Sequence, residues 1–213
     1  VRETVAYKIA VQAVPELAKK ELLPIYMPMT HDKAELELNH EKGAKALEAA
    51  GVHALILSGG FVSRAPMYVM RGAMPIRSLT YYMQQFWLPI GVRIAGHMMI
   101  PTVPFKEAYF FEDALKFREA VKLPLVYVGG LVSREKIDMV LDAGFDGVSM
   151  ARALLNEPDF VNRMGREENA RNACEHANYC IARMYSREMA CHKHIPDLPK
   201  KLLKELESAS KKN

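Results

Sequence analysis

The sequence has no long hydrophobic run and no leader-like start. None of its apolar stretches approaches the roughly 18 consecutive residues that a membrane-spanning helix requires. The chain also does not open with a positively charged segment followed by an apolar one, as a secretory signal would. We therefore expect neither a membrane span nor secretion, and we expect a protein of the cytoplasm.

Cysteine is scarce, and the two signs of charge are nearly balanced. Cys174, Cys180 and Cys191 fall in one late segment, and their odd number argues against a disulfide framework. They are therefore either reduced thiols or the remains of a metal site. The formal net charge of +4 is modest, and no basic stripe alternates with aromatic residues, so nucleic-acid binding is not expected.

The chain does have enough apolar residues for a full core. Hydrophobic residues make up 50% of its 213 residues, which supports one or at most two domains. Continuous runs of Val, Ile and Leu predict buried strands at residues 22–30, 52–60, 124–130 and 145–153. Amphipathic spacing predicts helices at residues 38–51, 105–121 and 133–144. This alternation indicates parallel βα units, so the predicted fold class is α/β.

Four βα units make half of a (βα)8 barrel of the TIM type. Complete barrels have about 250 residues, more than this whole chain has. Residues 1–20 read as a helix with no strand before it. We therefore expect the chain to be the C-terminal half of a TIM-type barrel, with about four βα units. An open four-stranded α/β sheet is the alternative.

Glycines and an arginine mark the ends of the last two predicted strands. In a parallel barrel the ligand sites lie where strands end and helices begin, and Gly129 and Gly130 stand at such a place. Ser133 can cap the following helix, whose amino end attracts anions. Arg152, at the end of the next strand, can grip phosphate oxygens at two points. The residues thus predict a phosphate site, and the alternative is a tight turn beside a surface arginine.

Three stretches carry a family resemblance: LEAAGVHALILSGG, LPLVYVGGLVSREKIDMVLDAGFDGVSMARALLNEPDF and CEHANYCIARMYSREMACH. Together they resemble the C-terminal half of the Old Yellow Enzyme family of FMN-dependent NAD(P)H oxidoreductases, especially its branch similar to 2,4-dienoyl-CoA reductase. The resemblance spans residues 1–195, which form the expected barrel half with a long loop at 61–104. Residues 196–213 are expected to form a charged C-terminal helix or tail.

The resemblance implies a cofactor, a reductant and a set of binding residues. In that family two adjacent strand ends hold the FMN phosphate, and the corresponding residues here are Gly129, Gly130, Ala151 and Arg152. Ala151 stands where family members usually have Gly. The resemblance also implies that NAD(P)H reduces the flavin, which then reduces an activated alkene or a similar small-molecule acceptor. The family's catalytic groups belong to its N-terminal half, so no catalytic residue is assigned in this chain.

The cysteine segment corresponds to the iron–sulfur segment of one branch of the family. A 4Fe-4S cluster needs four ligands, and Ala177 stands where a second cysteine is expected. Either His176 or His192 can in principle supply the missing ligand. We nevertheless expect a relic segment with reduced thiols, no metal site and no 4Fe-4S cluster.

The connection at 61–104 and the function as a whole leave alternatives open. The connection is rich in Met and aromatic residues, so it either walls a substrate pocket or covers the side of the barrel. Instead of an enzyme, the chain can be a non-catalytic half-barrel that binds a phosphate ligand or oligomerises through its sheet edges. As partners we expect further copies of the chain or a missing N-terminal half. Another barrel enzyme, such as an aldolase or isomerase, would need a Lys or acid that these strand ends lack.

Overall fold

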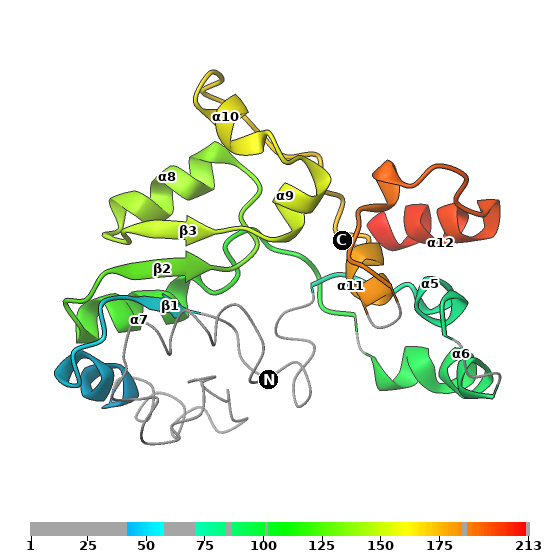
Figure 1. Cartoon of the computed structure of the whole chain (residues 1–213), viewed down its shortest axis with the longest axis horizontal. Coiled ribbons are helices and arrows are strands. Elements are labelled where there is room, and N and C mark those ends of the chain that lie inside the picture. The colour runs from blue at the N-terminus through cyan, green and yellow to red at the C-terminus, as the bar shows by residue number, and fades with distance from the viewer. Residues whose placement is uncertain (1–41, 58–70, 84–86, 101, 185–186, 212–213) are drawn as a thin grey trace. The chain divides into compact units, whose positions relative to one another are not determined.

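The computed structural model describes residues 42–57, 71–83, 87–100, 102–184 and 187–211 (Figure 1). The chain divides into two compact units. The first comprises Val1–Ala65, Phe110–Gly129 and Met139–Ser149, and the second comprises Pro66–Tyr109, Gly130–Asp138 and Met150–Asn213. The elements expected before residue 42, including the strand at 22–30, lie outside the described residues.

The first unit contains a small parallel sheet. Its strands are β1 (Leu55–Leu57), β2 (Leu125–Val128) and β3 (Gly147–Ser149), in the spatial order β1-β2-β3 (Figure 1). Leu55 lies opposite Leu125, and Val126 lies opposite Gly147. The predicted α/β class with parallel strands is therefore confirmed, and closure into a barrel stays a prediction.

Helices join these strands, as βα units require. Residues 42–49 are helical, and Gly51 ends this helix with φ +82°, a left-handed conformation that glycine adopts without strain. α7 (Phe111–Ala120) precedes β2, and α8 (Arg134–Asp142) connects β2 to β3. The predicted helix at 105–121 begins six residues late because Ala108, at φ +56°, cannot belong to a right-handed helix.

Aromatic side chains form the centre of the first unit. Tyr127 on β2 is completely buried and lies edge-on to Phe145, with ring centroids 5.9 Å apart. Phe111 of α7 lies 6.4 Å from the Tyr127 ring, which fixes this helix against the sheet. The Tyr127 hydroxyl accepts a hydrogen bond from the Phe110 amide and donates one to the Gly129 carbonyl, so its polar atom is satisfied inside the core.

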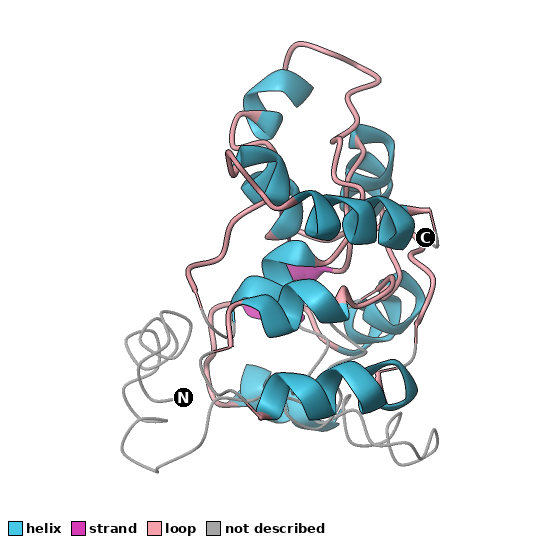
Figure 2. Cartoon of the chain, turned by 90° about the vertical axis from the view of Figure 1, so that its right-hand side faces the viewer, coloured by secondary structure: helices cyan, strands magenta, loops and turns pink. Residues whose placement is uncertain are grey.

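The described residues of the second unit form helices and loops, which are cyan and pink in Figure 2. Its helices are α5 (Ile76–Tyr81), α6 (Leu88–Met99), α9 (Arg152–Asn156), α10 (Phe160–Met164), α11 (Tyr179–Met184), the 3-10 helix η1 (His192–His194) and α12 (Lys200–Ser210). The described part of the long connection at 61–104 thus contains the helices α5 and α6. The charged segment at the C-terminus is largely the helix α12.

Among the described residues, two apolar clusters and the carboxylate of Glu205 hold this unit together. One cluster is built on Met74, Ile76, Leu79 and Ala182, and the other on Ala177, Tyr179, Leu198, Leu202 and Leu206. Glu205 of α12 accepts hydrogen bonds from the amides of Arg77 and Ser78, at 2.7 and 2.9 Å, and so fixes α12 at the amino end of α5. Among the described helices, none has the length and apolar character needed to cross a membrane.

Candidate functional site

The sheet places the two strand ends that the sequence singled out side by side. β2 and β3 run parallel, and their last pair joins Val128 to Ser149. The residues that follow these ends are Gly129–Gly130 and Met150–Arg152. The predicted pairing of these two strands as parallel neighbours is therefore confirmed, and the convergence of the four candidate residues on one phosphate stays a prediction.

Both glycines have a packing reason to lack a side chain. A Cβ atom on Gly129 would overlap the Tyr127 hydroxyl, and one on Gly130 would lie 2.5 Å from the Tyr109 ring. Gly130 also has φ +68°, in the left-handed region that strains other residues. The tight-turn interpretation of these glycines thus has direct support, because aromatic rings occupy the space that side chains here would need.

A carboxylate already occupies the amino end of α8. Glu107 Oε1 accepts hydrogen bonds from the amides of Val132 and Ser133 at 2.8 and 2.6 Å, and from Ser133 Oγ at 2.8 Å. Glu107 Oε2 lies 3.2 Å from Arg171 Nη1. Ser133 also caps the helix as predicted, since its Oγ lies 3.3 Å from the Lys136 amide. A phosphate at this edge therefore has to find its donors elsewhere.

Gly130 and Ala151, which follow the ends of β2 and β3 in the chain, are the next candidates for such donors. Within the described residues, the amide groups of Gly130 and Ala151 have no hydrogen-bond acceptor. Ala151 is exposed, and Gly130 is half-buried. Unpaired amides of this kind, together with a nearby arginine, are what an anion needs.

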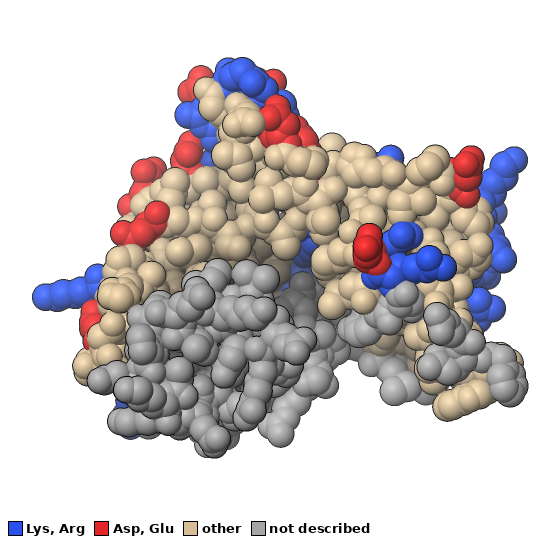
Figure 3. Space-filling model, viewed as in Figure 1, with Lys and Arg blue, Asp and Glu red and all other residues tan. Residues whose placement is uncertain are grey.

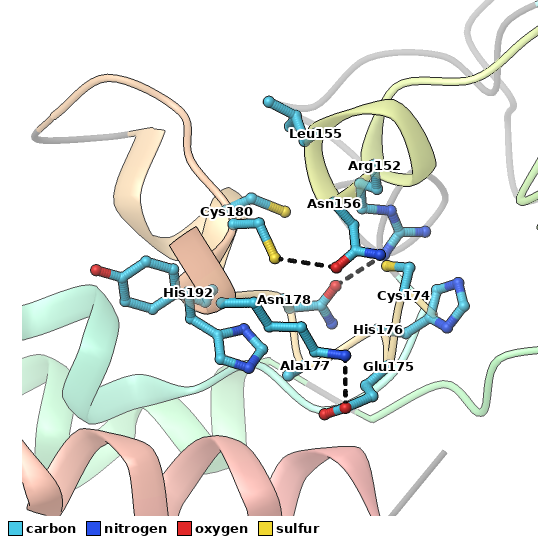
Figure 4. A pocket seen from close by; sticks show the side chains of 13 residues that line it. Arg152, Leu155, Asn156, Cys174, Glu175, His176, Ala177, Asn178, Cys180 and His192 are labelled. Atoms are coloured by element: carbon cyan, nitrogen blue, oxygen red, sulfur yellow. Dashed lines mark hydrogen bonds and ion pairs between the residues drawn. The ribbon is translucent and has the colours of Figure 1, made fainter. Parts of the chain in front are cut away.

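Arg152 is held in place by an asparagine that the sequence analysis missed. Its Nη1 donates to Asn178 Oδ1 at 2.9 Å (Figure 4). The Asn178 amide in turn donates to the main-chain oxygens of Arg71 and Ala73, at 2.9 and 3.2 Å. Asn178 has φ +55°, which asparagine tolerates better than most residues. Two fixed carbonyls therefore orient Asn178, and Asn178 orients the guanidinium.

His176 lies in the same part of the second unit and is kept neutral. Its ring stacks on Phe105, with centroids 3.4 Å apart and planes 19° apart. Burial, together with the positive charges of Arg152 and Arg171, lowers the His176 pKa to about 3. A neutral imidazole beside Arg152 adds no positive charge to an anion site at ordinary pH.

The three cysteines line one small cavity of about 20 Å³, together with Ala177 and His192 (Figure 4). This volume has room for about one water molecule. Burial raises the pKa of Cys180 to about 11 and raises that of Cys191, so both are protonated at neutral pH. In the described part of the chain, no group of three His, Cys, Asp or Glu side chains is arranged to hold a metal ion. The absence of a 4Fe-4S cluster stays a prediction.

A comparison with known proteins finds a relative with a similar amino-acid sequence. The chain is 35% identical over 144 residues to the 4,4'-dithiodibutanoate disulfide reductase of Rhodococcus erythropolis. This stretch covers 67% of the chain and 36% of the relative, so the chain spans about a third of that protein's length. No protein-family model matches the chain.

Among solved structures, the chain resembles a nitroalkane oxidase from Streptomyces ansochromogenes, with 18% identity and a TM-score of 0.29. The match covers 81% of this chain and 46% of that one. A TM-score this low carries no argument about fold or function.

Proposed function

We propose that the chain is the C-terminal half of the (βα)8 barrel of an FMN-dependent oxidoreductase of the Old Yellow Enzyme family. Gly129, Gly130, Ala151 and Arg152 would hold the FMN phosphate. Residues 1–195 would form the barrel half, and residues 196–213 a C-terminal addition. Copies of the chain, or a separate N-terminal half, would complete the barrel.

One observation carries this proposal: β2 and β3 end side by side, with Val128 opposite Ser149. Ligands of parallel α/β proteins bind at such carboxyl ends. The amides of Gly130 and Ala151, which have no acceptor within the described residues, supply two donors there. Asn178 holds Arg152 by one nitrogen, Nη1, so its other nitrogens can bind phosphate oxygens. The donor set therefore suits a phosphate group.

Each residue has a distinct task in this proposal. Arg152 neutralises and orients the phosphate, and Asn178 positions Arg152. Glu107 keeps the amino end of α8 occupied, which directs the phosphate toward Gly130 and Ala151. When bound, FMN would supply the chemistry that transfers a hydride from NAD(P)H to an acceptor.

The relative named after 4,4'-dithiodibutanoate indicates a class of acceptor in addition to activated alkenes. Reduction of a disulfide takes one hydride and one proton, breaks the S–S bond and leaves two thiols. We propose both classes as acceptors of the complete protein.

A comparison of FMN with riboflavin tests the proposal, because the two differ only in the phosphate. Flavin binding is measured by quenching of flavin fluorescence. We expect the chain to prefer FMN, and we expect Arg152→Gln to reduce the FMN affinity by about tenfold or more while leaving the riboflavin affinity unchanged. Arg166→Gln is the matched control, because Arg166 is exposed on the same unit and pairs with Asp159. Equal binding of FMN and riboflavin by the unmodified chain would contradict the proposal.

A further inference from the structure

The second unit has a cavity that is larger than the one beside the cysteines. It measures about 410 Å³ and lies between α5, α6 and α12. Its lining residues are Ile76, Arg77, Tyr81, Arg93, Lys201 and Leu202. The volume is within the range of pockets that bind small molecules, about 300–1,000 Å³. It shares no lining residue with the proposed phosphate site.

Positive charge dominates this cavity. Arg77, Arg93 and Lys201 each come from a different helix, and among the described residues no acidic side chain lines the cavity with them. Within the described residues, no carboxylate pairs with any of the three side chains. Lys and Arg side chains gather along the right-hand edge of Figure 3, beside α5 and α12. Three like charges around one opening repel one another, so an anion there relieves an unfavourable interaction.

The Glu205 carboxylate of α12 is engaged in hydrogen bonds at the amino end of α5. Glu205 of α12 bonds the Arg77 and Ser78 amides and the Ser78 hydroxyl, the last at 3.0 Å. Its charge is therefore engaged at the end of α5. Arg93 is oriented by a 2.9 Å hydrogen bond from its Nε to Thr80 Oγ1, which leaves the far side of its guanidinium for a ligand.

Apolar groups make up the rest of the cavity wall. Ile76 and Leu202 are 2% and 1% exposed and form the wall nearest the core. The Tyr81 ring is 43% exposed and is braced edge-on by Tyr82, with centroids 5.0 Å apart. Lys201 Nζ lies 5.8 Å from the Tyr81 ring centroid. A flat aromatic ring held beside cations suits a ligand that has both a π-face and negative charge.

We propose that this cavity binds a small organic anion that carries at least two negative charges and an apolar or aromatic body. Two sources have this chemistry: a nucleotide with two phosphate groups, and a dicarboxylate. The three cations would bind the negative charges of the ligand. Its apolar or aromatic body would pack against Tyr81, Ile76 and Leu202. The cavity is a second anion site, and it does not depend on the proposed flavin site.

Calorimetric titration of the full chain tests the site with four compounds. Adenosine 2′,5′-bisphosphate and 4,4′-dithiodibutanoate represent the two sources, whereas inorganic phosphate and adenosine each have only one of the two features. We expect at least one of the first pair to bind about tenfold or more tightly than either of the second pair, with weaker binding at higher salt. Which of the two binds identifies the source. Failure of both to exceed phosphate and adenosine overturns the proposal.

A double substitution locates the binding. Arg77→Gln with Lys201→Gln removes two of the three charges, and both side chains are exposed, so the fold should survive. We expect the affinity to fall by about tenfold, because each exposed charge contact contributes a few-fold. Lys204→Gln on α12 is the matched control, since Lys204 is exposed and does not line the cavity. Binding that survives the double substitution, or that falls equally in the control, overturns the proposal.

Discussion

Glu107 binds the amino end of α8 through Ser133: its Oε1 accepts hydrogen bonds from Ser133 N at 2.6 Å and from Ser133 Oγ at 2.8 Å. The favourable field of a helix amino end is therefore used by a side chain of the same unit. This relationship stabilises the turn after β2, and it restricts an external anion to the neighbouring amides.

Replacement of Glu107 by Gln tests the strength of this cap. The variant loses the negative charge that faces the helix amino end, while its one remaining oxygen can still accept a hydrogen bond. We expect the free energy of unfolding to fall by about 1–2 kcal/mol, as for the loss of a good cap. Urea denaturation measures the change.

Glu135→Gln is the matched control for this cap. Glu135 is in the first turn of the same helix, but its side chain is 80% exposed and pairs only with Lys136. We expect a change below about 0.5 kcal/mol. An equal fall in the free energy of unfolding in both variants would mean that Glu107 acts only through its negative charge near the helix amino end, and not through its hydrogen bonds.

Alanine substitutions at two glycines can separate the stability contribution of the Gly130 backbone conformation from that of its packing. Gly130→Ala places a residue in the left-handed region and drives its Cβ into the Tyr109 and Phe105 rings. Gly51→Ala has the same backbone problem, at φ +82°, but no atom within 4 Å of the new Cβ. We expect losses of about 1–2 kcal/mol for Gly51→Ala and of about 1–3 kcal/mol more for Gly130→Ala. Thermal or urea unfolding gives both values, and equal losses would show that the aromatic rings yield freely.

His176 should make the chain less stable in acid. Its pKa is about 3 when folded and near 6.5 when unfolded, so the unfolded chain binds more protons between these values. Stability therefore rises with pH through this window and is lost as the pH falls from about 6.5 toward 3, by up to about 1.4 kcal/mol per unit. Urea unfolding at several pH values should show a smaller slope for His176→Asn, because asparagine tolerates the φ of +54° and does not titrate.

The unmodified chain, unfolded in urea over the same pH range, is the reference for this slope. If His176→Asn has the same slope as the unmodified chain, the imidazole does not titrate with the unfolding transition, and the account of its burial is wrong.

Cys180 should be a poor nucleophile in the folded chain. Burial raises its pKa to about 11 from an ordinary value of 9.0. At pH 8 its thiolate fraction is then about 100-fold lower than in the unfolded chain, and alkylation slows accordingly. Iodoacetamide labelling, followed peptide by peptide with mass spectrometry, measures the rate. The same reaction in denaturant should label all three cysteines, and rapid labelling of Cys180 without denaturant would contradict the prediction.

The sequence patterns predict the positions of the helices and strands better than they predict the contacts between them. The runs at 124–130 and 145–153 contain β2 and β3, and the amphipathic stretch at 133–144 contains α8, because apolar spacing alone specifies such elements. α7 begins later than the predicted helix at 105–121 because Ala108 has a positive φ, and the surrounding structure rather than the local sequence sets this backbone conformation. The helix cap by Glu107 had no sequence signal, because it comes from 26 residues away.

The glycines show why a correct position can have more than one cause. The sequence predicts that Gly129 and Gly130 allow a ligand to approach, whereas the structure shows that Tyr127 and Tyr109 require them for packing. Asn178, which orients Arg152, had only its place between Cys174 and Cys180 as a signal. Contacts among residues far apart in the chain decide these roles, and no local pattern encodes them.

The visible absorption spectrum of the purified protein tests the central claim most directly. The claim is that the chain is part of an FMN protein whose phosphate site lies at the ends of β2 and β3. We predict that the chain, purified and then incubated with FMN and freed of excess, retains flavin absorption, and that Arg152→Gln treated in the same way loses most of it. A protein that stays colourless after this treatment, or an Arg152→Gln variant that retains FMN as fully as the unmodified chain, would contradict the account.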